Sequence, residues 1–327
     1  MKRLVLVTQA VDPDHPVLAT AVSKIGALAT RVDELTVLAL RARPAHLPAN
    51  TRVATFGAPT QALRGARLGA LLAREALLRR PAAVVAHMSP IYALIAARLR
   101  LPTLLWYTQW RTNPLLERAV DHVDLVLTAD EASFPYRSPK VRAIGHGIDV
   151  ARFACATPPG RARLRLLALG RYAEVKGYAA LLGTMRGLDA ELLIHGSTET
   201  EADTRHRAEL VRQAPANVSI GGPVAPAEVP ALLAGADALV SATRGGADKV
   251  VFEACAACVP AFAPAAAFAA LLPNELRFDD DLGQKLRAFA ATAAAERAEL
   301  GRALRARVER SHSVEHWADE VVAAAGL

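Results

Sequence analysis

One stretch in the last third of the chain carries the residues whose types and spacing best suit anion binding. Ala238–Val240 predicts a short buried strand, and Gly245–Gly246 follows it in a loop where a ligand can approach the backbone. A helix is expected to begin at Ala247 or Asp248 and to end before Pro260. Free N–H groups at the start of a helix attract anions, so a phosphate group would fit there.

A carboxylate follows in the same predicted helix. Glu253 lies five residues after Asp248, about one and a half turns into the helix. It can accept hydrogen bonds from two vicinal hydroxyl groups, as a ribose presents them. The loop, the helix start and the acid together predict a nucleotide held by its phosphates and its sugar. Lys249, at the start of the helix, either adds a cation to this site or faces the solvent.

Two cations occupy a second loop, which follows the strand predicted at Leu164–Leu169. Arg171 and Lys176 lie five residues apart, and Lys176 is close to the start of the next predicted helix. Two cations can neutralise a diphosphate and the charge that grows on it as it leaves. Their spacing to Glu253, with alternating strands and helices between, favours one shared nucleotide site.

Both stretches resemble the donor site of retaining glycosyltransferases of family 4, which carry Gly-Arg-x4-Lys-Gly and, further on, Glu-x7-Glu before Ala-x-Ala-x-Gly-x-Pro. The matching positions are Gly170, Arg171, Lys176, Gly177, Glu253, Ala254, Ala256 and Pro260. Cys258 stands where the family has glycine, and Gly245 where it has the first glutamate, which usually contacts the transferred sugar. The resemblance implies an α/β chain with the GT-B fold, in which two Rossmann-like domains with doubly wound parallel sheets face a cleft.

The resemblance also implies a nucleoside-diphosphate sugar, such as a UDP- or GDP-sugar, as co-substrate, with no other cofactor bound. Arg171 and Lys176 would hold the diphosphate as catalytic groups, and the backbone around Gly222 would meet the nucleobase. Asp248 either caps its helix or replaces the missing glutamate at the sugar. The donor-binding candidates are Gly170, Gly222, Val224, Gly245, Gly246, Ala247, Asp248, Lys249, Val250 and Glu253.

His87 is the third catalytic candidate, because it ends the strand predicted at Ala82–Ala86 and precedes a helix. A packing or helix-capping histidine is the alternative interpretation. The family often has a histidine near this point, facing the cleft, and many members carry another in the segment after Thr103–Tyr107. Here Tyr107 and Gln109 are the nearest residues. Either the amide of Gln109 or the phenol of Tyr107 takes the role of the family's histidine, or His87 does, or the family's histidine aligns with a different position of this chain.

The first half of the chain also offers acceptor contacts, since loops at the carboxyl ends of strands face the ligand crevice of an open α/β sheet. The loop after the strand Leu4–Val7 lacks Gly-x-Gly-x-x-Gly, which argues against a nicotinamide cofactor. Trp110 can stack on a sugar, Arg111 can bind an acceptor phosphate, and His146 either contacts the donor or caps a turn. The acceptor-side candidates are Gln9, Asp14, Gln109, Trp110, Arg111 and His146.

The expected domain organisation has four parts. An acceptor-side Rossmann-like domain spans residues 1–152, a linker 153–163 and the donor domain 164–310. Residues 311–327 are expected to form a helix, which in the family crosses back to the N-terminal domain. A long helix is also predicted at Gln61–Leu78.

Charge is distributed unevenly along the chain. Residues 1–150 contain 19 Lys and Arg against 11 Asp and Glu, whereas the remaining residues contain 20 against 21. The basic half either attracts an anionic acceptor or a membrane surface, at which the protein would bind peripherally, or is a solvated surface. Aromatic and basic residues do not interleave, so no nucleic acid partner is expected.

Three cysteines are too few for a disulfide scaffold, which favours a reducing cytoplasm. The sequence shows neither a secretion signal nor an apolar stretch long enough to span a bilayer. Cys255 and Cys258 form Cys-x-x-Cys, but two packed apolar residues are favoured over a redox pair or half a zinc site. No metal is assigned.

The predicted function is therefore a retaining, metal-independent glycosyltransferase that moves a sugar to a hydroxyl group of a small molecule, a glycan or a lipid-linked glycan. Two alternatives stay open. A sugar-nucleotide-binding module without catalysis would explain Gly245 and the missing histidine near Tyr107. A sugar-nucleotide epimerase of the same architecture would need carboxylates or histidines placed to remove a proton, and the sequence offers only scattered candidates for them.

Overall fold

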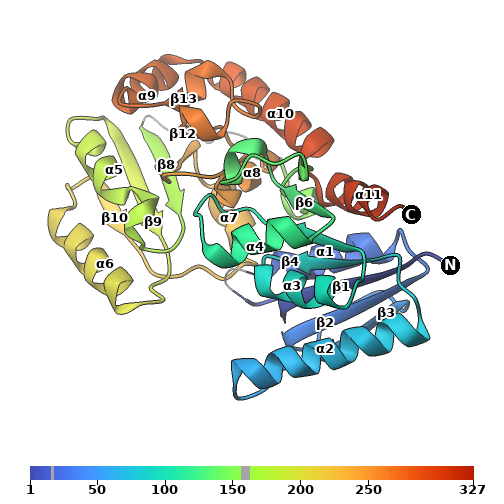
Figure 1. Cartoon of the computed structure of the whole chain (residues 1–327). Helices are drawn as coiled ribbons and strands as arrows, with labels where there is room; N and C mark the ends of the chain where they lie inside the picture. The colour runs from blue at the N-terminus through green and yellow to red at the C-terminus, as the bar shows by residue number, and fades with distance from the viewer. Residues whose placement is uncertain (16–17, 156–162) are drawn as a thin grey trace. The chain divides into compact units, whose positions relative to one another are not determined.

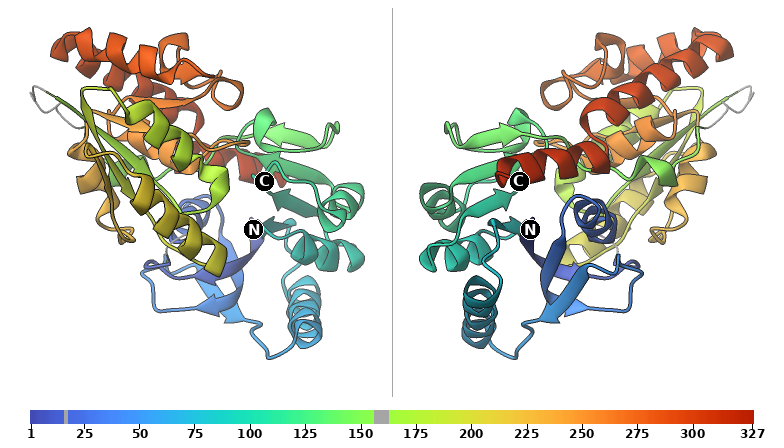
Figure 2. Two further views of the ribbon diagram at one scale, coloured as in Figure 1. Left: turned by 90° about the vertical axis from the view of Figure 1, so that its left-hand side faces the viewer. Right: turned by 90° about the vertical axis from the view of Figure 1, so that its right-hand side faces the viewer.

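The computed structural model describes residues 1–15, 18–155 and 163–327 (Figure 1). Contacts within the chain divide it into two compact units, of which unit 1 comprises Met1–Asp149 and Ser311–Leu327 and unit 2 comprises Val150–Arg310. Both ends of the chain therefore belong to unit 1, where Figure 2 also places them. Most of the linker predicted at 153–163 lies outside the described residues.

Unit 1 is built on a sheet of seven parallel strands in the order β3-β2-β1-β4-β5-β6-β7. The strands are β1 (Arg3–Val11), β2 (Glu34–Ala42), β3 (Thr51–Thr55), β4 (Ala83–His87), β5 (Thr103–Trp106), β6 (Leu125–Thr128) and β7 (Val141–Ala143). The central strands consist largely of leucine, valine and alanine, because both faces of a parallel sheet are covered by helices.

Helices cover both faces of this sheet. Leu4 and Leu6 of β1 pack in one cluster with Trp317 of the C-terminal helix, whereas Val5 and Val7 point to the other face and pack in a second cluster. The first face is covered by α1 (Thr20–Ala29) and α11 (Val314–Ala324). The second is covered by α2 (Gln61–Leu78), α3 (Pro90–Arg98) and α4 (Pro114–His122), and α2 has the bounds predicted from the sequence.

Unit 2 is built on a sheet of six parallel strands in the order β10-β9-β8-β11-β12-β13. The strands are β8 (Leu164–Leu169), β9 (Ala190–His195), β10 (Val218–Ile220), β11 (Ala238–Val240), β12 (Ala261–Pro264) and β13 (Arg277–Phe278). The helices are α5 (Tyr178–Met185), α6 (Glu201–Gln213), α7 (Val229–Ala234), α8 (Lys249–Ala256), α9 (Leu282–Ala291) and α10 (Ala294–Ser311).

In each sheet the first strand is central and the strand order reverses beside it. The reversal lies between β1 and β4 in unit 1 and between β8 and β11 in unit 2. Such switch points leave a crevice at the carboxyl ends of the strands, where open α/β sheets bind ligands. Two doubly wound parallel sheets confirm the predicted fold class and locate one candidate crevice in each unit.

The C-terminal helix α11 belongs to unit 1, where it contacts α1 (Figure 2). The backbone N–H of Ile148 donates a hydrogen bond of 2.7 Å to the carbonyl of His312 just before the helix. Gly145 approaches the same segment so closely that a Cβ atom there would lie 2.0 Å from the carbonyl oxygen of Ser311. Because Gly145 also has a φ of +81°, only glycine fits this junction.

A disulfide between Cys155 and Cys258, 103 residues apart, corrects the inference drawn from the cysteine count. Cys155 is exposed and Cys258 is buried just after α8, so both half-cystines lie in unit 2. Cys255 remains a free thiol in the interior, so the interpretation as a packed apolar residue holds for Cys255 alone. The sequence could not reveal this pair, because its partners meet only in the folded chain.

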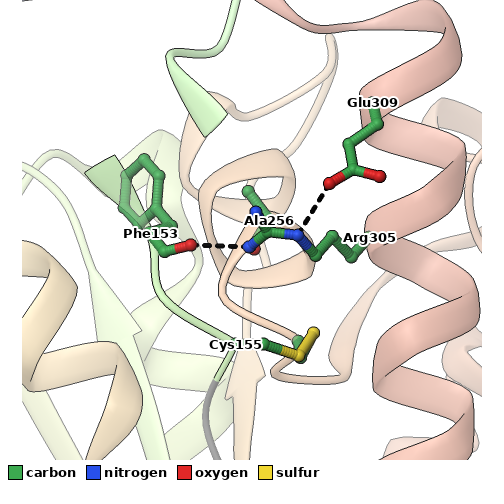
Figure 3. Close-up of a disulfide and its surroundings, with 6 residues drawn as sticks. Phe153, Cys155, Ala256, Arg305 and Glu309 are labelled. Carbon is green, nitrogen blue, oxygen red and sulfur yellow. Dashed lines mark hydrogen bonds and ion pairs between the residues drawn. A yellow bond between two sulfur atoms is a disulfide. The ribbon is translucent and has the colours of Figure 1, made fainter. Parts of the chain in front are cut away.

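Arg305 of α10 holds the same two segments together beside the disulfide (Figure 3). Its guanidinium donates a hydrogen bond of 2.6 Å to the carbonyl of Phe153 and a second to the carbonyl of Ala256. Its Nε atom also donates to Glu309, one turn further along α10. The segment before Cys155 is therefore fixed to the end of α8 both covalently and by hydrogen bonds.

Candidate nucleotide site

Loops that follow β8 and β11 meet at the switch point of unit 2. A Cβ atom on Gly177 would lie 2.4 Å from the carbonyl oxygen of Ala242, and Gly177 has a φ of +67°. The backbone N–H of Arg244 donates a hydrogen bond of 2.9 Å to the carbonyl of Val175. The loop with the two predicted cations is thus packed directly on the loop that leads into α8.

Lys176 and Asp248 join these loops by an ion pair, with 2.8 Å between Nζ and Oδ2. The hydroxyls of Thr243 and Ser241 donate to the same carboxylate oxygen at 2.7 and 3.1 Å. The side chain of Asp248 is only 10% exposed. Burial acts to raise the pKa of Asp248, but the Lys176 charge and these hydrogen bonds outweigh it and lower the pKa.

Asp248 occupies the N-cap position of α8, yet its side chain makes no capping hydrogen bond. The predicted capping role is therefore wrong, because the carboxylate turns to Lys176 instead. No side chain among the described residues caps the first turn of α8, which leaves N–H groups of that turn for an anion. Gly245 and Gly246 precede the helix with φ values of +78° and +75°, and Ala247 and Val250 are buried.

Lys249 and Glu253 form an ion pair within α8. The carboxylate of Glu253 is buried, whereas Lys249 is partly exposed. Lys249, predicted either to add a cation to the site or to face the solvent, is thus 35% exposed and bound to Glu253. In this arrangement its ammonium group is bound to the acid that the sequence assigns to the ribose.

Arg171 pairs with Glu199, just before α6, at 3.4 Å and with Asp203, in the first turn of α6, at 3.8 Å. Burial acts to raise the pKa of Asp203, but a hydrogen bond from the Glu199 backbone and the Arg171 charge help to lower it. The Arg171 side chain is 43% exposed and can turn toward a ligand. In this structure Arg171 and Lys176 therefore bind different acids.

The loop predicted to meet the nucleobase is held by backbone contacts. The carbonyl of Gly222 accepts a hydrogen bond of 3.1 Å from the N–H of Gly196, and Val224 follows in the same loop. The Tyr172 hydroxyl lies 2.8 Å from the carbonyl oxygen of Gly221 and 3.0 Å from that of Ile194. Tyr172 is fully buried and was missed by sequence reasoning, because nothing in a lone tyrosine indicates its distant partners.

Gly170 explains why Lys176 can reach Asp248. A Cβ atom on Gly170 would lie 2.9 Å from Cε of Lys176 and 3.1 Å from the hydroxyl of Tyr178, and the residue has a φ of +148°. The Tyr178 hydroxyl is buried and has no hydrogen-bond partner among the described residues. Burial and the Asp248 charge raise its pKa well above 10, so Tyr178 remains neutral.

In unit 1 the predicted residue His87 lies at the switch point between β1 and β4. Its Nδ1 atom is 3.3 Å from the hydroxyl oxygen of Thr8, and its ring stacks on Trp106 with 5.4 Å between the ring centroids. The ring of His146 lies 5.9 Å from the same tryptophan. Lys24, also buried, places Nζ 3.9 Å from the Trp106 ring centroid.

Burial and the Lys24 charge lower the pKa of His87 from 6.5 to about 3. His87 is therefore neutral at physiological pH and can exchange hydrogen bonds with a ligand without carrying charge. Its burial agrees with the packing interpretation, and its place at the switch point agrees with the functional one.

Among the remaining acceptor-side candidates, Gln9 lies near His87, because its Nε2 atom donates a hydrogen bond of 3.4 Å to the carbonyl of Met88. Gln9 lines a cavity of about 340 Å³ with Asp12, Arg41 and Arg43, and the two arginines were missed because a single charged residue at a strand end carries no signal. Gln109 accepts a hydrogen bond from the Tyr107 hydroxyl, and Trp110 is 45% exposed. Within the described ranges, the side chains of Asp14, Gln109, Trp110 and Arg111 form no hydrogen bond or ion pair with His87.

The stability of unit 1 is expected to fall as the pH falls below 6.5. Burial lowers the pKa of His87 to about 3 and that of His312 to about 4, so the unfolded chain binds protons that the folded chain does not. The free energy of unfolding should drop by roughly 1.4 kcal/mol per pH unit for each histidine. Urea unfolding between pH 7.5 and 4.5 measures this slope, and His87→Gln should remove the contribution of His87 to it. An unchanged slope in that variant would contradict the burial of His87 in a neutral form.

The described residues contain no group of three or more His, Cys, Asp or Glu side chains arranged to hold a metal ion. They also contain no helix that is both long enough and apolar enough to cross a bilayer.

Known proteins were compared with the chain by sequence and by structure. A family model described as "Glycosyl transferase-like" matches residues 176–323, which is slightly less than half of the chain. No curated protein matches the sequence significantly.

Solved structures match over nearly the whole chain. Sucrose-phosphate synthase from Thermosynechococcus elongatus has a TM-score of 0.79 at 14% identity, covering 98% of this chain and 97% of that one. The Anabaena protein Alr3699/HepE, solved in complex with UDP and glucose, has a TM-score of 0.75 at 16% identity and covers 99% of both chains. A glycosyltransferase from Rickettsia africae has a TM-score of 0.75 at 12% identity, covering 99% and 98%. The chain thus has the GT-B fold of glycosyltransferases, and its C-terminal part is similar to the glycosyl transferase-like family.

Proposed function

We propose that the protein is a retaining glycosyltransferase that moves a sugar from a nucleoside-diphosphate sugar to a hydroxyl acceptor without a bound metal. The observation that carries this proposal is the position of Lys176 beside the start of α8, which no described side chain caps, at the switch point between β8 and β11. A cation and free helix N–H groups at one place are what a diphosphate requires. Structural neighbours of the same fold include a protein solved with UDP-glucose, which favours UDP over GDP as the nucleotide.

Each part of the donor has a group suited to it. Lys176, Arg171 and the first N–H groups of α8 would stabilise the charge on the departing diphosphate. Glu253 would accept hydrogen bonds from the ribose hydroxyls, with Lys249 keeping the carboxylate in place. The backbone of the Gly222–Val224 loop would meet the nucleobase. Because His87 is neutral, its role would be to hydrogen-bond the sugar or the acceptor rather than to supply charge.

Retention follows from the family resemblance and is part of the proposal. In this mechanism the acceptor attacks the face from which the diphosphate departs, and a leaving phosphate oxygen takes the acceptor proton. The test is the anomeric configuration of the product formed from UDP-glucose and a hydroxyl acceptor, followed by proton NMR. An α-linked product supports retention, and a β-linked product contradicts it.

A binding module without catalysis is the second candidate, and Gly245 favours it, because glycine stands where the family has a glutamate that usually contacts the sugar. Titration with UDP separates the two functions. A module would bind UDP yet release none from UDP-glucose with any acceptor, whereas the transferase would release UDP when an acceptor is present. An epimerase would instead convert the sugar of UDP-glucose without releasing UDP.

Replacing Glu253 with alanine is expected to weaken UDP binding about tenfold or more, because hydrogen bonds from the ribose to a charged acceptor are lost. Binding of inorganic pyrophosphate should change less than about threefold, since pyrophosphate has no ribose and Lys249 is retained. Isothermal titration calorimetry measures both affinities. Glu209→Ala, an exposed acid of α6 in the same unit, serves as the control. Equal losses for UDP and pyrophosphate would contradict the ribose contact.

The acceptor and the cellular location are proposed from the sequence. We expect a hydroxyl acceptor, a cytoplasmic location and peripheral contact of the basic residues 1–150 with anionic membranes. The Cys155–Cys258 disulfide removes the cysteine count as an argument for a reducing compartment. Co-sedimentation with anionic and neutral vesicles at low and high salt tests the membrane contact.

A further inference from the structure

Asp248 is the residue of the candidate site whose position the family signature does not explain. It lies between the glycine loop and α8, and its carboxylate binds Lys176 instead of capping the helix that it precedes. Three donors converge on its Oδ2 atom, from Lys176, Ser241 and Thr243. The two hydroxyls are themselves 3.1 Å apart, so the carboxylate is held by a connected network.

The network comes from both sides of the switch point. Lys176 follows β8, whereas Ser241, Thr243 and Asp248 follow β11. The hydrogen bond from the Arg244 N–H to the Val175 carbonyl fixes the two backbones at 2.9 Å beside the ion pair. The ammonium group of Lys176 is therefore bound to the loop after β11, whose backbone is itself held by the Arg244 hydrogen bond.

A lysine needs a partner that fixes its ammonium group if the charge is to have one defined position. Its stem has four flexible carbons, and its ammonium group is a compact charge that many positions can satisfy. The side chain of Lys176 is still 19% exposed, so the ammonium group can bind a further anion while it donates to Asp248. Catalysis by charge stabilisation depends on groups that are already in place when the charge develops.

We propose that Asp248 is a positioning residue that acts through Lys176, holding the ammonium group where the diphosphate of the donor departs. This inference rests on the proposed function, and it replaces both roles considered for Asp248 from the sequence. Asp248 does not contact the transferred sugar, and Ser241 and Thr243 keep its carboxylate directed at the lysine.

The test compares Asp248→Ala with Asp248→Asn in two backgrounds. Both variants remove the negative charge, but asparagine keeps an oxygen that can accept from Lys176, so their ratio isolates the geometry of the contact. The measurements are the rate of UDP release from UDP-glucose and the Kd of inorganic pyrophosphate. With Lys176 present, Asp248→Asn should release UDP at least about tenfold faster than Asp248→Ala. In the Lys176→Ala background the two should be equal within about twofold, since the lysine that Asp248 positions is gone.

Other outcomes identify other roles. A tenfold difference that persists without Lys176 would mean that Asp248 contacts the donor directly or supports the fold, and would overturn the inference. Melting temperatures of all variants separate those two cases, because only a structural role lowers them together with the rate. If the wild-type protein bound neither pyrophosphate nor UDP, the proposed function itself would fail. If it bound and turned over the donor but showed equal ratios in both backgrounds, the positioning role alone would fail.

Discussion

Replacing Lys176 with alanine is expected to lower kcat at least about a hundredfold, which is the usual loss when one preorganised charge-stabilising group is removed. The variant also leaves the buried carboxylate of Asp248 without its cation, close to a ligand that is itself anionic. Binding of UDP should therefore weaken as well, but the loss should be larger in turnover, because the charge that Lys176 stabilises grows as the diphosphate departs. Steady-state kinetics of UDP release and calorimetric titration with UDP measure the two quantities separately.

Arg171→Ala is expected to have a loss of similar size, although Arg171 must first turn from Glu199 and Asp203 to reach the diphosphate. Arg205→Ala is the matched control, because this arginine lies in the same unit, is largely exposed and, among the residues that the structure describes, pairs only with exposed Glu201. Its kinetics should not change. Unchanged kinetics in the Lys176 and Arg171 variants as well would place the site elsewhere.

Removing the disulfide should have the largest effect on stability. In the chain-entropy model, a cross-link that closes a loop of about 100 residues stabilises the folded state by about 4.7 kcal/mol, and measured values commonly reach 2–5 kcal/mol. Cys155 and Cys258 are 103 residues apart, and the loop they close contains most of unit 2. Cys155→Ser should therefore lower the melting temperature of unit 2 by roughly 10 °C. The hydrogen bonds of Arg305 to Phe153 and Ala256 should keep the variant folded at room temperature.

Calorimetry with and without dithiothreitol measures this effect. Reduction of the wild type should reproduce the Cys155→Ser melting temperature, and the variant itself should not respond to reductant. Thiol titration in denaturant should find one free thiol before reduction, that of Cys255, and three after it. The Cys255 thiol should not exchange with the disulfide in the folded protein, because burial raises its pKa to about 12. Three free thiols in protein purified without reductant would contradict the disulfide.

The elements of the fold were predictable where local pattern decides them. The helix at Gln61–Leu78 has an apolar stripe of helical period and the predicted bounds. The helix of the nucleotide site begins at Lys249, within two residues of the expected start, and ends before Pro260. Alternation of strands and helices predicted parallel strands, because parallel strands are joined by crossover connections that are usually helices. The division into two such sheets was implied by the family resemblance.

Contacts between distant residues were not predictable from the sequence. Asp248 was predicted to cap its helix because aspartate favours that position. Its carboxylate instead binds Lys176, which lies 72 residues earlier in the chain. Cys258 looked like an apolar residue of a Cys-x-x-Cys pair, since its true partner lies 103 residues away. Burial of His87 depends on Trp106 and Lys24, which reach it from other elements. In each case the residue type was visible and its partner was not.

A crystal structure of the protein with bound UDP would show directly where the diphosphate lies. We expect it within about 3 Å of Nζ of Lys176 and of N–H groups in the first turn of α8, with the ribose at Glu253. UDP bound to unit 1, or a diphosphate that contacts neither Lys176 nor α8, would contradict this expectation.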